Sequence, residues 1–168
     1  MARMTRTGTA TYLYCVAHGK RAPSLTRAPR GLPGTTRLRA LAAGDDLWLI
    51  VADAPLDRYG SAPVEARLRD LDWVAACATA HEAVVEHVAR AATTIPLKLF
   101  TLFNDDARAV AHVHGAEARI RRVLQRVEGC RAPLYLQDKM WPGLKLYLPV
   151  LFLRFPFLPL HIQQEVLP

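Results

Sequence analysis

The chain has 168 residues, of which 51% are hydrophobic and 22% are charged, and it carries a formal net charge of +7. This length can bury a substantial core, and the composition is that of an ordinary globular protein rather than a disordered or fibrous one. No uninterrupted apolar run of about 18 residues occurs, so no membrane-spanning helix is predicted. The three cysteines, Cys15, Cys77 and Cys130, are far apart and lack C-x-x-C spacing. We therefore expect buried thiols in a reducing cytosol, without a disulfide framework or a zinc site.

The first part of the chain is predicted to form strands. Residues 12–17 combine aromatic and aliphatic side chains over the length of one strand. Residues 18–34 hold three glycines and three prolines, which predict an unusually long loop. Residues 36–42 alternate apolar side chains with arginine, and 47–53 are nearly all apolar. These patterns predict a second strand followed by a central strand that is covered on both faces.

The middle of the chain is predicted to be mostly helical. Apolar residues recur every three or four positions within 62–91, which predicts one bent helix or two, with Trp73 mostly buried on the apolar face. Residues 95–103 are predicted to be a strand in which Pro96 is tolerated near the start or on an edge. Residues 105–128 have a second helical stripe, with acidic residues in the first turn.

These elements predict an α+β domain of two layers, in which several strands share one antiparallel or mixed sheet and the helices lie on one face. After Arg131 the composition changes. Residues 132–168 contain six prolines, and 12 of the 17 residues in 144–160 are apolar, with neither a helical nor a strand period. We therefore expect a domain over 1–131 and an irregular Pro/Leu/Phe-rich tail over 132–168 outside the packed core.

No complete catalytic or metal-binding motif is present. His81-Glu82 lacks the second histidine four positions on that a zinc protease needs, so His81 is expected at the margin of the core. His112 and His114 are two residues apart on a predicted helix and cannot readily chelate together. The carboxylate pairs at 45–46 and 105–106 are typical of a turn and of a helix start. No catalytic, cofactor-binding or metal-binding residue is predicted, and no cofactor.

Positive charge is concentrated in residues 1–40, which hold eight basic side chains and no acidic one. Such a segment can meet nucleic acid, anionic lipid or an acidic partner, although most charge runs are solvated surface. The aromatic residues that could stack on bases, without the RNA-recognition signature, are Trp48, Trp73, Phe100 and Phe103. Nucleic acid is therefore an unlikely partner.

Several motifs occur together in one order. They are Tyr12-Leu13-Tyr14-Cys15-Val16-Ala17, a hairpin ending in Leu47-Trp48-Leu49-Ile50-Val51-Ala52-Asp53-Ala54-Pro55, a helix with Leu71-Asp72-Trp73 and Ala80-His81-Glu82-Ala83-Val84, the segment Thr94-Ile95-Pro96-Leu97-Lys98-Leu99-Phe100-Thr101-Leu102-Phe103, and an Arg-rich amphipathic helix that closes at Glu128-Gly129. This order, with its gaps, resembles the GvpL/GvpF family of gas vesicle proteins over residues 12 to 130.

The resemblance implies an N-terminal domain of modified ferredoxin-like type. It implies a non-enzymatic accessory or minor structural protein of gas vesicle assembly, cytoplasmic and gas vesicle associated, that binds the shell protein GvpA and other gas vesicle proteins. Two alternatives stay open. One is a basic nucleic-acid-associated protein, and the other is a truncated or frame-shifted, inactive gas vesicle gene product. The oligomeric state is not predicted.

The chain departs from the family pattern in two places. Many members read Phe-Gly-Thr where this chain has Leu99-Phe100-Thr101, so phenylalanine replaces a residue that allows close backbone approach. Family members would also continue with an acidic-aromatic strand and a second, largely α-helical domain. Residues 132–168 match neither.

Overall fold

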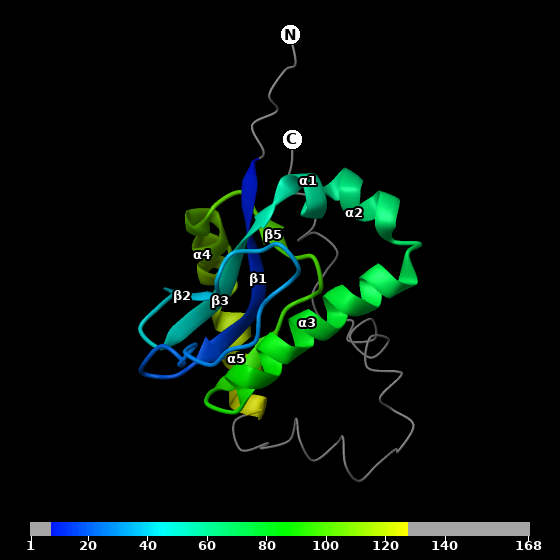
Figure 1. Ribbon diagram of the computed structural model, residues 1–168. Coiled ribbons are helices and arrows are strands. Elements are labelled where there is room, and N and C mark those ends of the chain that lie inside the picture. The colour runs from blue at the N-terminus through cyan, green and yellow to red at the C-terminus, as the bar shows by residue number, and fades with distance from the viewer. Residues whose placement is uncertain (1–7, 128–168) are drawn as a thin grey trace.

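The computed structural model describes residues 8–127, which form an antiparallel sheet flanked by helices (Figure 1). The strands lie in the order β2-β3-β1-β4, and β5 also pairs with β1. Their bounds are β1 Thr9–His18, β2 Arg39–Ala42, β3 Leu47–Pro55, β4 Thr93–Pro96 and β5 Leu102–Phe103. The central strands are β1 and β3, which are buried along nearly their whole length because both faces of each are apolar.

The helices cover both faces of this sheet. They are α1 Leu56–Tyr59, α2 Ser61–Arg67, α3 Leu71–Ala89, α4 Asp106–Gly115 and α5 Glu117–Val127. One core cluster joins the sheet to α1 and α3, with Tyr59, Cys77 and Val84 buried in it. The other joins the sheet to α4 and α5 through Val113 and Leu124. In Figure 1, α3 crosses in front of the sheet and α4 lies behind it.

The α+β class and the ferredoxin-like antiparallel sheet are thus confirmed, but the expectation that the helices share one face is wrong. An apolar stripe shows that a helix buries one side, and it does not say which face of the sheet receives it. The second face of β1 and β3 is equally apolar, and α4 and α5 cover it. The fold therefore has a helical layer on each side of the sheet.

A β-bulge in β1 sets which side chains face α3. The register with β3 shifts between Leu13 and Cys15. As a result Tyr12, Tyr14 and Cys15 all belong to the cluster on the α3 side, whereas Leu13 and Val16 belong to the other. Bulges re-aim side chains in this way. Here the bulge places two tyrosines side by side beneath α3, with ring centroids 4.7 Å apart.

Several element boundaries differ from the prediction. Of the two possibilities predicted over 62–91, one bent helix or two, the structure has two helices, separated at 68–70. The single helix predicted over 105–128 is divided at Ala116. The second strand is shorter than 36–42, and the short helix α1 was not predicted. The strand predicted over 95–103 is wrong in its middle, because β4 and β5 are separate segments.

Cys15 and Cys77 are buried free thiols, as predicted, and Cys130 lies outside the described residues. Trp73 packs against the α3-side cluster but is only half-buried, so the expectation that it is mostly buried is corrected. The tail at 132–168 also lies outside the described residues. Among the helices of residues 8–127, none has the length and apolar character needed to cross a membrane.

Candidate interaction surface

Three residues interrupt the edge strand that is formed by β4 and β5. The backbone N–H of Leu97 donates to the carbonyl of Tyr14, and the N–H of Leu13 donates to the carbonyl of Thr101, each at 3.0 Å. Residues 14 and 13 are adjacent on β1, whereas 97 and 101 are four apart. The residues between, 98–100, therefore loop out of the sheet. Phe100 in this loop has φ of 64°, a left-handed conformation that favours glycine.

A buried hydrogen-bonded relay holds both ends of this loop. His81 Nε2 lies 3.1 Å from the Leu97 carbonyl oxygen, which can only accept, so Nε2 carries the proton. Nδ1 then accepts from the Tyr12 hydroxyl at 2.7 Å. The Tyr12 oxygen accepts in turn from the N–H of Phe100 at 3.2 Å. His81 on α3 thus binds the Leu97 carbonyl before the loop directly. Through Tyr12 it also holds the Phe100 amide at the end of the loop.

Burial keeps this relay uncharged. It lowers the pKa of His81 to about 4 and raises the pKa of Tyr12 well above its ordinary value. His81 is 3% exposed, so a neutral imidazole is the form that the core accepts near neutral pH. His81 was expected at the margin of the core, but it lies within the core, where it has a structural role.

An aromatic stack lies over the loop. The rings of Trp73 and Phe100 are parallel within 7°, with centroids 5.3 Å apart, and Tyr59 adjoins both at 6.3 and 6.4 Å. The guanidinium carbon of Arg67 lies 4.4 Å from the centre of the Trp73 ring, within the range of a cation–π contact. The stack joins α1, α3 and the loop at 98–100. Because Trp73 lies in the first turn of α3, the stack packs against the α2–α3 junction.

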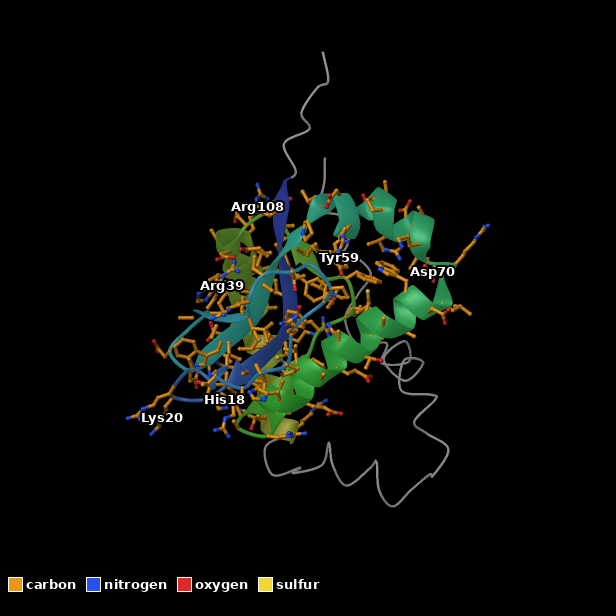
Figure 2. The ribbon with its side chains drawn as sticks, viewed as in Figure 1. His18, Lys20, Arg39, Tyr59, Asp70 and Arg108 are labelled. Carbon is orange, nitrogen blue, oxygen red and sulfur yellow. The ribbon has the colours of Figure 1, made fainter. Side chains whose placement is uncertain are left out.

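The α2–α3 junction presents apolar side chains to solvent. We call Arg67, Leu68, Leu71 and Trp73 the elbow surface. Leu71 is 76% exposed and Leu68 is 51% exposed, and α2 has no buried residue. Asp70 caps α3 by accepting the N–H of Trp73 at 3.1 Å, and Figure 2 shows Asp70 at the end of α3 that lies away from the sheet. The cap fixes the turn, so the two leucines project from an ordered junction.

The long loop between β1 and β2 forms a basic surface. Its exposed cations, which form no ion pair within residues 8–127, are Lys20, Arg21, Arg27, Arg30 and Arg37. The loop is fastened to the core, because Leu32 is buried and donates its N–H to the Tyr14 hydroxyl at 2.9 Å. The Tyr59 hydroxyl donates to the Pro33 carbonyl at 2.8 Å. In Figure 2, Lys20 points outward at the far end of the sheet from Asp70.

Three of the four carboxylates in the acidic pairs have structural roles. The Asp105 side chain accepts the N–H of Arg108 at 2.7 Å and caps α4. Asp46 lies between Arg121, at 2.8 Å, and His18, at 2.9 Å, and these two partners lower the pKa of its carboxyl to about 2. Asp106 accepts from Thr11 at 2.7 Å and from Arg39 at 2.6 Å.

The other residues considered from the sequence do not converge on one site. Trp73 and Phe100 stack, but Trp48 donates its indole N–H to the Gly19 carbonyl and Phe103 packs in the α4-side cluster. Within residues 8–127, no group of three or more His, Cys, Asp or Glu side chains could hold a metal ion. The relay of Tyr12 and His81 was missed, since nothing in the sequence places these two residues together. The phenylalanine that replaces glycine at position 100 was the one available signal of a kink.

The described residues thus define a small α+β domain that is distinguished by exposed apolar and basic surfaces. The family model described as "Gas vesicle synthesis protein GvpL/GvpF" matches residues 10–132, so the chain belongs to this family. It is also similar to gas vesicle protein L of Streptomyces sp. (strain CB03234), with 34% identity over 84 residues. That match covers 50% of this chain and 32% of the relative, so the chain spans about a third of that protein's length. No solved structure matches the chain.

Proposed function

We propose that this chain is a non-enzymatic accessory protein of gas vesicle assembly that binds the shell protein GvpA and other gas vesicle proteins in the cytoplasm. Family membership supports the gas vesicle role. The observation that carries the binding role is the elbow surface, where Leu68 and Leu71 face solvent beside a half-buried tryptophan. A very hydrophobic shell subunit needs partners that cover apolar surface until it assembles, and exposed apolar side chains can supply that cover.

The elbow surface has the composition of a binding anchor. Tryptophan and arginine are enriched among the residues that dominate interface energies, and here Arg67 packs over Trp73. The exposed leucines contribute little to the fold, because α2 buries none of its residues and Leu71 is the first residue of α3. Apolar side chains that the core does not need are available to a partner.

A pull-down of the full chain against each product of its gene cluster tests this proposal, with Leu71→Asp as the disrupting variant. An aspartate in the first turn of α3 suits the helix dipole, so this variant should fold normally. The matched control is Val123→Asp, which places the same charge at a residue that is 37% exposed on α5, across the sheet. We expect Leu71→Asp to abolish capture of GvpA and Val123→Asp to leave it unchanged.

The same experiment separates the proposal from its main alternative. The cations of the β1–β2 loop could bind nucleic acid, and such binding weakens steeply as the salt concentration rises. Failure to capture any gas vesicle protein, together with tight and salt-sensitive binding of DNA or RNA, would favour a nucleic-acid-associated protein instead.

A further inference from the structure

Strand β2 forms an open edge of the sheet. It pairs with β3, and within residues 8–127 no strand lies on its other side. The Ala43 N–H donates to the Leu47 carbonyl at 2.8 Å, which closes the hairpin. Hydrogen-bonded and non-hydrogen-bonded pairs alternate along an antiparallel ladder. The backbone groups of Ala42 and Ala40 must therefore point away from β3, toward the open edge.

An apolar hollow of about 450 Å³ lies beside this edge on the α4 face of the sheet. Leu41 contributes its side chain from β2, and α4 contributes a wall of small and aliphatic residues. The residues of α4 that line it are Ala107, Val110 and Ala111, with Asp106 and His114 also at its boundary. An exposed edge with an apolar hollow beside it is a site to which another strand can add.

Two charged residues that flank this edge lie symmetrically about Leu41. Arg37 lies four residues before Leu41, and Asp45 lies four residues after it in the hairpin turn. Both side chains are exposed, and neither has an ion-pair partner within residues 8–127. A strand with a cation at one end and an anion at the other is complementary to an antiparallel copy of itself.

We propose that two copies of this chain associate through β2, antiparallel to one another, with Leu41 on the two-fold axis. The backbone groups that point outward select this register. Ala40 of each copy pairs with Ala42 of the other, so each pair exchanges its two hydrogen bonds. Arg37 of each copy then reaches the hairpin turn that carries Asp45 of the other. Pairing Ala40 with Ala40 instead would place Leu41 against Arg39 and would separate these charges.

The same arrangement places an apolar side chain in the hollow. The two Leu41 side chains face one another as a non-hydrogen-bonded pair, in which side chains approach most closely. Each enters the space beside α4 of the other copy. The interface uses one patch on both subunits, so association closes at a dimer and removes the open edge.

Sedimentation velocity of the full chain over a wide concentration range tests this dimer. We expect wild type to dimerise and Ala42→Pro to be monomeric, because proline removes the amide that points to the second copy and is tolerated on an edge strand. Ala42→Val keeps that amide and should still dimerise. Circular dichroism of both variants verifies that the fold is retained.

A charge-reversal cycle tests the register. Arg37→Asp and Asp45→Arg should each weaken the dimer roughly tenfold, since each places like charges together at both symmetric contacts. The double variant should restore it. A monomeric wild type, a dimer that survives Ala42→Pro, or a double variant that stays weak would overturn the proposal. A monomer whose Ala40 and Ala42 amides resist hydrogen exchange would overturn it too, and would show that another part of the chain covers β2.

Discussion

Replacing His81 with glutamine should remove a defined part of the acid sensitivity of this protein. His81 is neutral in the fold with a pKa of about 4, whereas an unfolded histidine titrates near 6.5. Between pH 4 and pH 6.5 the His81 side chain is therefore protonated in the unfolded chain but neutral in the folded chain. The contribution of the neutral His81 to stability is therefore present above about pH 6.5, falls as the pH is lowered, and changes no further below about pH 4.

The size of this loss follows from the two pKa values. Each pKa unit corresponds to about 1.4 kcal/mol, so the difference gives a loss of about 3 kcal/mol in the free energy of unfolding between pH 6.5 and 4. Glutamine does not titrate, yet its amide can accept from Tyr12 with oxygen and donate to Leu97 with nitrogen. The variant should therefore fold while losing this pH-dependent contribution.

Urea unfolding from pH 7.5 to pH 3.5 measures the effect. Subtracting the curve of His81→Gln from that of wild type cancels the carboxylates whose pKa is lowered, namely Asp46, Asp106 and Glu117, since these are common to both proteins. We expect the difference to change by about 3 kcal/mol across the stated window. Parallel curves would refute the buried neutral histidine and the relay built on it.

Three further predictions concern the aromatic stack and the tail. Phe100→Gly and Phe100→Ala both remove the stacked ring, but only glycine relaxes the left-handed backbone, so chemical denaturation should find the glycine variant more stable by about 1 kcal/mol; equal stabilities would show that the backbone is unstrained. Trp73→Ala should cost about 2 kcal/mol in the same assay, less than the 3–5 kcal/mol typical of a fully buried aromatic, and a neutral variant would contradict the stack. We propose that the domain ends near Arg131, so limited proteolysis should quickly remove 132–168 and leave a stable fragment, whereas protection of that segment would contradict this boundary.

The central strands were predictable because burial on both faces leaves an unmistakable pattern. Residues 12–17 and 47–53 are apolar almost throughout, and they form most of β1 and β3. The family resemblance could also be recognised from the sequence, since it depends on the order of motifs along the chain. Buried thiols at Cys15 and Cys77 followed from their positions within apolar segments.

Features that depend on tertiary contacts could not be predicted from the sequence. Tyr12 accepts the Phe100 amide in the loop at 98–100, and His81 binds the Leu97 carbonyl just before it. Neither residue is near the loop in the chain. The apolar stripe of α3 placed Trp73 on the correct side of the helix. It could not reveal that the start of α3 lies away from the sheet, which leaves Trp73 half-buried and Leu71 exposed.

The most direct test of the proposed function is the binding of GvpA to the full chain in cells, measured with a split reporter for wild type, Leu71→Asp and Val123→Asp. An apolar contact at the elbow surface predicts a strong signal for wild type and Val123→Asp and background signal for Leu71→Asp, at equal protein levels. Background signal for all three proteins would contradict binding of GvpA. An equal signal for all three would show that GvpA binds elsewhere on the chain.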